Sequence, residues 1–273
     1  MFDDITKVLL LSDMDGTLLT GDKRISDIDR AAIDRFTALG GRFTVATGRT
    51  IQSFEQYRAM IDLPYPVVMY NGSAIYDYSA EKTLYSQPLP LEARQITADI
   101  LRELPEVGGE VLRAEGTYIF RDNPYEQLHT KLCNIVPEFM GLEEIPEGGW
   151  LKVLFAMAPE DIPHIERLVR EMGIDAVSFV RSAEIFYEMM PLGVSKGSAL
   201  RQFRKLPGWE DFSFAAIGDF DNDIEMIQAA DLGACPANAA GSVKNAADLV
   251  LDKTNEEGAV AQLIDHIIER CGV

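Results

Sequence analysis

An apolar run near the start of the chain ends in two carboxylates, and this junction constrains the fold more than any other stretch. Residues 8–11 read Val-Leu-Leu-Leu, and after Ser12 come Asp13-Met14-Asp15-Gly16-Thr17. A continuous apolar run bounded by turn residues is typical of a buried strand in a parallel sheet. Ligands of open α/β sheets bind outside the carboxyl ends of such strands. The sequence therefore predicts that Asp13 and Asp15 lie at a site.

The spacing of Asp13 and Asp15 favours a cation. In an extended chain, residues i and i+2 point the same way, with Cα atoms about 7 Å apart. Carboxylates held together repel each other unless a cation intervenes, and Mg²⁺ is the usual hard cation for oxygen ligands. An ordinary Asx turn is the alternative, because Asp and Gly both favour turns. A calcium loop of the EF-hand type is excluded, because its further acidic positions are absent.

The net charge narrows the classes of partner. The chain has 25 basic and 44 acidic side chains, which leaves a formal charge of −19. Nucleic-acid surfaces need clustered Lys and Arg, so we expect no nucleic-acid partner, and an anionic membrane is disfavoured for the same reason. No apolar run approaches the roughly 20 residues that span a bilayer. A small anionic substrate is compatible with this charge if a metal ion and a few placed cations reverse the local field.

The cysteines and the N-terminus indicate a cytoplasmic protein. Cys133, Cys235 and Cys271 are scattered and form no Cys-x-x-Cys pair, which is typical of a reducing compartment. Residues 1–11 lack the basic and long apolar regions of a signal peptide. The three histidines lie far apart in sequence, and two of them fall in amphipathic helix patterns, which favours solvated helix faces over metal ligands.

The first and last parts of the chain alternate strands with helices. Apolar periodicity and turn residues predict helices at 26–39, 51–61, 195–203, 223–230 and 258–268, and strands at 8–11, 42–46, 67–70, 212–217, 231–235 and 248–251. Ser26 is the expected N-cap of the first helix. Strands alternating with helices of this length imply parallel βαβ units. We therefore predict an α/β fold with a doubly wound, Rossmann-like parallel sheet.

The rhythm changes between residues 84 and 188. Helical periodicity recurs at 91–104 and 161–172, and short strands are expected at 117–121, 151–157, 177–181 and 185–189, the last two as a hairpin. Strands and helices in this order indicate an α+β module. We predict a core made of residues 1–83 and 189–273, interrupted by an inserted α+β domain at 84–188.

Further polar turns follow the other core strands. Thr47-Gly48-Arg49 comes after the strand at 42–46. A hydroxyl and a backbone N–H next to a helix N-terminus form a phosphate cradle, although a Thr-Gly turn beside a solvated Arg is equally common. After the strand at 212–217, three acids fall within the five residues 219–223. They suit a divalent cation with oxygen ligands, and a solvated acidic turn is the alternative.

Lys196 is expected at the start of a helix, after Gly193-Val194-Ser195. The helix macrodipole is positive there, so a cation is disfavoured unless an anion lies nearby. A lysine that simply faces solvent is the alternative.

Together these segments resemble the haloacid dehalogenase superfamily, and among its members the Cof-type phosphatases with a large inserted α/β cap. The matching segments span the chain and occur in the family's order: residues 13–17, 46–49, 193–197 and 218–223, with Asn71-Gly72 after the third strand. Met14 stands where this subgroup usually has Leu or Phe, and Phe220-Asp221 stands where Gly-x is common. Neither difference removes a reacting group.

The resemblance implies a Mg²⁺-dependent phosphatase that works through an aspartyl-phosphate. Asp13 would be the nucleophile. Mg²⁺ would be bound by the Asp13 carboxylate, the Asp15 backbone carbonyl and Asp219. Asp15 would protonate the leaving alcohol and then activate the water that cleaves the intermediate.

The other motif residues would bind the phosphoryl group. The resemblance implies that the Thr47 hydroxyl, the Gly48 N–H, Lys196 and Asn222 hold its oxygens. Asp223 would orient Asp219 or Lys196.

The substrate is expected to be a small phosphorylated metabolite, with sugar phosphates as the leading class. Position at strand ends suggests Arg49, Asn71, Arg181 and Glu188 as residues that read the leaving group. Related transport ATPases have Thr in place of Asp15, so the acid at this position favours a hydrolase. A phosphomutase with the same motifs and a non-catalytic metabolite-binding protein on this fold are the alternatives. The sequence predicts no oligomeric state.

Overall fold

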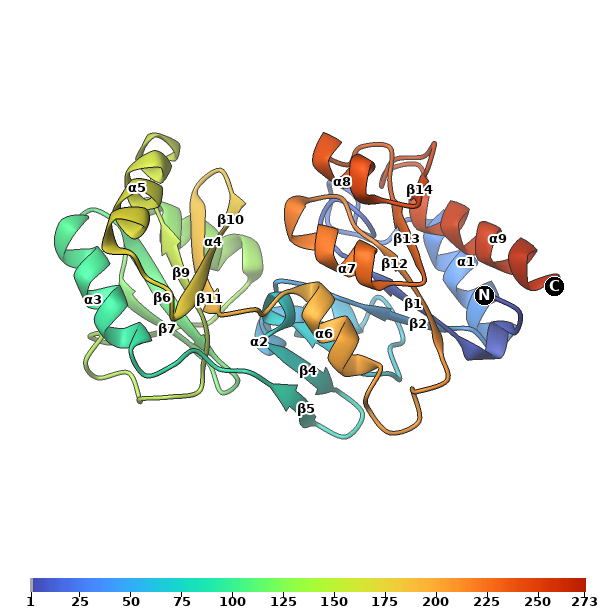
Figure 1. Ribbon diagram of the computed structural model, residues 1–273, viewed down its shortest axis with the longest axis horizontal. Coiled ribbons are helices and arrows are strands. Elements are labelled where there is room, and N and C mark those ends of the chain that lie inside the picture. Colours follow the sequence, from blue (N-terminus) through green and yellow to red (C-terminus); the bar gives the residue numbers. More distant parts are fainter. Residues whose placement is uncertain (1) are drawn as a thin grey trace. The chain divides into compact units, whose positions relative to one another are not determined.

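The computed structural model describes residues 2–273, which form two compact units (Figure 1). The first unit contains the residues up to Gly48, together with Gln56–Tyr85 and Ser195–Val273, and the second contains Arg49–Glu55 and Ser86–Val194. The domain limits at residues 84 and 188 stay predictions. Strand β11 (Phe186–Pro191) runs across the second of these limits.

The first unit is built on a parallel sheet of order β14-β13-β12-β1-β2. Its strands are β1 (Val8–Ser12), β2 (Arg42–Val45), β12 (Ser213–Ile217), β13 (Leu232–Cys235) and β14 (Leu249–Val250). The chain leaves β1 toward β2 on one side and leaves β12 toward β13 on the other, so the winding direction changes between β1 and β12. This is the topological switch point at which open α/β sheets bind their ligands.

Helices cover this sheet. α6 (Lys196–Phe203) and α7 (Ile224–Ala229) pack against each other and against the sheet face that carries Leu9 and Leu11, while α1 (Asp27–Ala38) packs against α9 (Ala259–Cys271) (Figure 1). A short α8 (Gly241–Ala246) precedes β14. All five residues of β1 are buried, as expected for a central strand of a sheet with both faces covered. The doubly wound α/β core predicted from the sequence is confirmed.

The start of α1 follows the predicted capping. The Ser26 hydroxyl accepts a hydrogen bond from the backbone N–H of Asp29, at 3.0 Å, which satisfies one of the N–H groups left free at a helix N-terminus.

A three-stranded sheet, β3 (Val67–Met69), β4 (Ala74–Asp77) and β5 (Lys82–Ser86), follows α2 (Ile51–Arg58). A bridge between Ala46 and Val68 brings β3 beside the end of β2.

The second unit contains a six-stranded sheet of order β10-β11-β9-β6-β7-β8, antiparallel except between β7 and β8. Its strands are β6 (Gly108–Arg113), β7 (Thr117–Arg121), β8 (Glu138–Phe139), β9 (Trp150–Ala156), β10 (Val177–Ala183) and β11. Residues of α3 (Ala93–Glu103) and α5 (Ile162–Met172) share one apolar core with the sheet, and α4 (Pro124–Cys133) packs against β6 and β9. The predicted α+β character and the β10–β11 hairpin are confirmed.

Several elements differ from those expected. α2 ends at Arg58, three residues before the predicted end, and β4, β5, β6, β8, α4 and α8 were not predicted. Within residues 2–273, none of the helices combines the length and the apolar character that crossing a bilayer requires.

Candidate active site

The switch point brings the loops after β1 and β12 together. Ser12 is the sheet neighbour of Ile217, and the backbone N–H of Asp13 donates to the carbonyl of Ile217 at 2.9 Å. Asp13 and Gly218 therefore leave adjacent strands at the same edge of the sheet. The acids that follow in each loop meet there: oxygens of Asp13, Asp219 and Asp223 all lie within 4.8 Å of one another. We call these three residues the aspartate cluster.

Lys196 places a buried cation against the aspartate cluster. Its Nζ lies 2.6 Å from Asp13 Oδ1 and 2.6 Å from Asp223 Oδ1, and its side chain is 1% exposed. Lys196 is the first residue of α6, after the N-cap Ser195, whose hydroxyl accepts from the backbone N–H of Ser198. The unfavourable interaction of this lysine with the positive end of the helix macrodipole is thus compensated by two carboxylates.

Burial sets the electrostatics of these groups. It raises the pKa of Asp13 well above its usual value, against the opposing effect of the Lys196 charge. It also raises the pKa of Asp219 to about 6. Burial opposes the charge on Lys196, but Asp13 and Asp223 outweigh it and raise the pKa of the lysine. Lys196 therefore stays charged. Its single positive charge does not balance three carboxylates, so Asp13, Asp219 and Asp223 are not all ionised together unless a further cation binds.

Asp219 is held close to the loop after β1. Its Oδ1 accepts a hydrogen bond from the Thr17 hydroxyl at 2.8 Å. A Cβ on Gly16 would lie 2.4 Å from Asp219 Oδ2, and the φ of Gly16 is +87°. Glycine is therefore required at position 16 both for the backbone conformation and for the close approach of the carboxylate.

Asp223 uses both of its oxygens to hold its neighbours. Oδ1 accepts from Lys196 Nζ, and Oδ2 accepts from the backbone N–H groups of Asp219 at 3.0 Å and Phe220 at 3.2 Å. The structure thus links Asp223 to both of the residues that it was expected to orient.

The aspartate cluster suits a divalent cation. Asp13 and Asp219 each use Oδ1 for a hydrogen bond, and within residues 2–273 no hydrogen bond engages Oδ2 of either. Two carboxylate oxygens from adjacent loops are therefore available, and an all-oxygen donor set suits a hard cation. Both oxygens of Asp223 already accept hydrogen bonds. The donor set fits a metal held by Asp13 and Asp219.

The Asp15 side chain points to a different partner. Its Oδ1 lies 2.7 Å from the Nζ of Lys23, and both side chains are half exposed. The sequence analysis did not single out Lys23. It lies in the turn closed by hydrogen bonds between Thr20 and Arg24, and its φ is +60°.

The residues expected to bind phosphate come together beside this cluster. Asn222 Nδ2 donates to Asn71 Oδ1 at 3.1 Å, and the backbone N–H of Asn71 donates to the carbonyl of Thr47 at 3.0 Å. A Cβ on Gly48 would lie 2.8 Å from Asn71 Oδ1. Asn71 adopts a left-handed conformation with φ of 54°, which asparagine tolerates better than most residues. These four residues therefore form one group within the first unit.

The remaining candidates lie in the second unit. Arg49 belongs to its first segment. The Arg181 guanidinium donates to the carbonyls of Ala183 at 3.1 Å and Glu184 at 3.4 Å. Glu188 is buried in β11, and its Oε1 lies 2.8 Å from Lys152 Nζ. Its expected role as a reader of the substrate stays a prediction.

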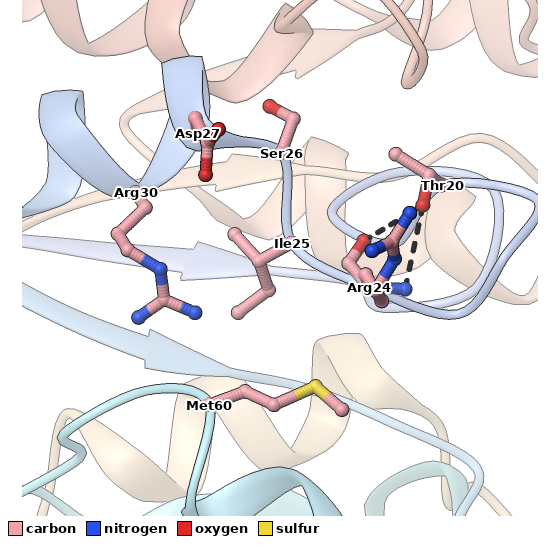
Figure 2. Close-up of a pocket in the computed structure, with 7 residues that line it drawn as sticks. All are labelled: Thr20, Arg24, Ile25, Ser26, Asp27, Arg30 and Met60. Carbon is pink, nitrogen blue, oxygen red and sulfur yellow. Dashed lines mark hydrogen bonds between the residues drawn. The ribbon is translucent and has the colours of Figure 1, made fainter.

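A separate cavity of about 300 Å³ lies in the first unit, at the start of α1 (Figure 2). Its lining residues are Thr20, Arg24, Ile25, Ser26, Asp27, Arg30 and Met60. No residue of the aspartate cluster lines it. Charges of both signs meet in this cavity, so it lacks the single sign of charge expected of an ionic binding site.

Comparison with known proteins finds one matching family model and several similar phosphatases. The family model for haloacid dehalogenase-like hydrolases matches residues 10–264. The 5-amino-6-(5-phospho-D-ribitylamino)uracil phosphatase YcsE of Bacillus subtilis (strain 168) is 28% identical over 97% of this chain and 97% of its own length. The pyridoxal phosphate phosphatase YbhA of Escherichia coli (strain K12) is 26% identical over 96% of this chain and 99% of its own length.

Solved structures share the fold over nearly the whole chain. The crystal structure of a haloacid dehalogenase-like hydrolase from Bacteroides thetaiotaomicron superposes with a TM-score of 0.82 at 25% identity, covering 95% of this chain and 98% of that one. That coverage includes both compact units.

Proposed function

We infer that this chain, which belongs to the haloacid dehalogenase-like hydrolases, is a Mg²⁺-dependent phosphatase of small phosphorylated metabolites. It is a phosphoric monoester hydrolase, and sugar phosphates are its leading substrate class. One observation carries the proposal: Lys196, Asp13 and Asp219 meet at the switch point of the sheet, with a carboxylate oxygen of each aspartate available. Two relatives named as phosphatases of phosphorylated metabolites support it.

Asp13 is the nucleophile in this proposal. One of its carboxylate oxygens forms a bond to phosphorus while the ester P–O bond breaks, which gives an aspartyl-phosphate and the leaving alcohol. Lys196 holds Oδ1 of Asp13 at 2.6 Å, which fixes this carboxylate at the switch point of the sheet. The contact with Lys196 also favours the ionised, nucleophilic form of the carboxylate.

Asp15 moves the protons. Its carboxyl group gives a proton to the leaving oxygen and later takes one from the water that attacks the aspartyl-phosphate. The Asp15 side chain is half exposed beside Lys23, and access to solvent suits a group that exchanges protons with water. Lys23 acts as a positioning residue for this carboxylate.

Thr47, Gly48, Lys196 and Asn222 bind the phosphoryl oxygens. Each offers a donor group: a hydroxyl, a backbone N–H, an ammonium and a side-chain amide. Asn71 fixes the Asn222 amide through its Oδ1 and lies against Gly48. Donors that are positioned before the reaction stabilise charge as it shifts from ester to acyl-phosphate.

Asp13, Asp219 and the backbone carbonyl of Asp15 are the proposed ligands of Mg²⁺. When bound, the ion supplies the positive charge that lets a carboxylate approach a phosphate dianion. The −19 net charge makes such local compensation necessary for any anionic substrate. A cytoplasmic location belongs to the same proposal, supported by three scattered cysteines that form no Cys-x-x-Cys pair.

A panel of phosphorylated metabolites tests the proposal. We expect inorganic phosphate to be released from one or more members in the presence of MgCl₂ and not after addition of EDTA. Product analysis separates the alternatives. An isomeric sugar phosphate without phosphate release would identify a phosphomutase, and binding without turnover across the panel would identify a metabolite-binding protein.

A further inference from the structure

The second unit contains a buried group of titratable side chains that the proposed phosphatase does not use. Glu110 lies in β6, and Glu126 and His129 lie on α4; we call these three residues the histidine cluster. Both glutamates have 0% of their surface exposed. Glutamate is almost never fully buried unless it is paired, so this arrangement needs an explanation.

The two glutamates lack the partners that buried carboxylates normally have. Apart from their contacts with His129, the four carboxylate oxygens have no hydrogen-bond partner within residues 2–273, and neither glutamate forms an ion pair with Lys or Arg there. The sheet neighbours of Glu110 are apolar: Ile119 on β7 and Leu154 on β9. Two buried, poorly satisfied carboxylates that face each other cost several kcal/mol if both are ionised.

The geometry of the histidine cluster matches the spacing of ligands around one metal ion. His129 Nδ1 lies 3.0 Å from Glu110 Oε1 and 3.8 Å from Glu126 Oε1, and one donor atom from each residue lies within 4.8 Å of the others. Two ligands that each bind a tetrahedral Zn²⁺ at about 2.1 Å lie about 3.4 Å apart. The observed separations fall on either side of this value.

Helix periodicity brings these donors to one face of α4. Glu126 and His129, the two buried residues of the helix, are three residues apart, and Cys133 follows four residues after His129 on the same side of α4. Asn123 caps the helix by accepting hydrogen bonds from the N–H groups of Tyr125 and Glu126, which fixes the first turn. The imidazole is 11% exposed, with its Nδ1 on the buried side.

We propose that Glu110, Glu126 and His129 form a second metal site, which binds a divalent transition-metal ion of the Zn²⁺ type. Imidazole is a preferred ligand of Zn²⁺ and its neighbours in the transition series, whereas Mg²⁺ prefers oxygen ligands alone. The site therefore differs in metal preference from the all-oxygen aspartate cluster. The proposal is independent of the phosphatase function.

A shared proton is the competing explanation. Burial raises the pKa of Glu126 to about 7. Burial alone would lower the His129 pKa, but the Glu110 charge and the polar contacts of His129 with Cys133, Glu110 and Glu126 together raise it well above its usual value. A protonated Glu126 beside a Glu110–imidazolium pair would be neutral without any metal. The experiment must therefore distinguish an ion from a proton.

Zinc binding by the full-length protein tests the proposal. Purified protein is titrated with ZnCl₂ by isothermal titration calorimetry in excess MgCl₂, and the bound metal is counted after dialysis. We expect one Zn²⁺ per chain. Glu126→Gln and His129→Gln should each weaken binding by at least about tenfold, because loss of even an outer-shell partner of a metal ligand typically costs about 10–100-fold in affinity. The matched controls His164→Gln, at an exposed histidine of α5, and Asp219→Asn, in the aspartate cluster, should bind as the wild type does.

Thermal unfolding checks that the variants fold. Glu126→Gln removes a charge that burial disfavours, so without zinc this variant should unfold at or above the wild-type temperature. Added Zn²⁺ should raise the unfolding temperature of the wild type and not that of Glu126→Gln. The proposal is overturned if the wild type binds no zinc, if Glu126→Gln and His129→Gln bind it as tightly as the wild type, or if Asp219→Asn abolishes binding. A folded protein that takes up no zinc would identify the cluster as a proton-sharing group.

Discussion

The aspartate cluster and the histidine cluster solve the same electrostatic problem in different ways. Each gathers carboxylates away from water, which costs free energy unless positive charge compensates. In the first unit the compensation is built in, because Lys196 lies 2.6 Å from both Asp13 and Asp223. In the second unit the only basic side chain in contact with the two glutamates is an imidazole, whose charge depends on a proton.

The compensating charge determines which chemistry each cluster can support. The Lys196 charge favours the ionised form of Asp13 against the effect of burial, and among the described residues Oδ2 of Asp13 and Oδ2 of Asp219 make no hydrogen bond and can accept a hard cation. The histidine cluster has no permanently charged basic side chain, so its net charge depends on whether a proton or a metal ion binds to it. Reaction chemistry is therefore expected in the first cluster, and ion uptake in the second.

The sharpest test of this contrast is Asp13→Asn. The amide cannot form the aspartyl-phosphate, so kcat for phosphate release should fall by about 10⁴-fold or more. Asp34→Asn, at an exposed aspartate of α1, is the matched control and should retain activity. Unchanged turnover by Asp13→Asn would remove the assigned nucleophile.

Lys196→Met should strongly destabilise the fold. It leaves Asp13 and Asp223 without their buried cation, and breaking a buried ion pair typically costs about 3–5 kcal/mol. Chemical denaturation measures this loss. Lys152→Met breaks the buried Lys152–Glu188 pair of the second unit. It should lower the free energy of unfolding by a similar amount, because both ion pairs are buried. If Lys196→Met were as stable as the wild type, the lysine would not compensate the aspartate cluster.

Asp15→Ala should lower kcat by about 10²–10⁴-fold, the usual contribution of proton transfer. Lys23→Ala should have a smaller effect, below about tenfold, because a half-exposed ion pair contributes little. The two variants together separate the proton donor from its positioning residue. A loss below about threefold for Asp15→Ala would refute its role.

The response to Mg²⁺ should depend on pH. The Asp219 pKa of about 6 lies above its unfolded value near 3.8. Its contribution to the stability of the metal-free protein is therefore complete below about pH 4 and is lost as the pH rises through 6. A bound cation reverses this loss: at 100 times its Kd it adds about 2.7 kcal/mol.

Thermal unfolding at two pH values measures the effect. Added MgCl₂ should raise the unfolding temperature more at pH 7.5 than at pH 5, where protons compete for Asp219. Asp219→Asn should reduce the increase at pH 7.5. An equal rise at both pH values would contradict the assignment of Asp219 as a ligand.

The sequence predicts the first cluster well because its residues follow strand ends. Asp13 comes directly after β1, and Thr47 and Asp219 follow β2 and β12 after one intervening residue. The carboxyl ends of parallel strands meet at one edge of the sheet. The position of Lys196 at a helix start was informative for a physical reason, since the macrodipole disfavours a cation there. The ion pair between Asp15 and Lys23 could not be anticipated, because it depends on a left-handed turn.

The histidine cluster could not be predicted in this way. Glu110 lies in the interior of β6, and nothing in its local sequence distinguishes a buried glutamate from an exposed one. α4 was missed, although Asn123-Pro124 is a helix-start signal, with an N-cap followed by proline at the first position. The spacing of Glu126 and His129 acquires meaning only when β6 is known to lie opposite.

Detection of the covalent intermediate tests the central claim most directly. Wild-type enzyme turning over p-nitrophenyl phosphate with MgCl₂ is quenched in acid, digested and analysed by mass spectrometry. We expect a phosphoryl group on the peptide that contains Asp13, and none in the Asp13→Asn variant. A phosphoryl group on another residue, or rapid turnover with no phosphorylated peptide, would contradict it.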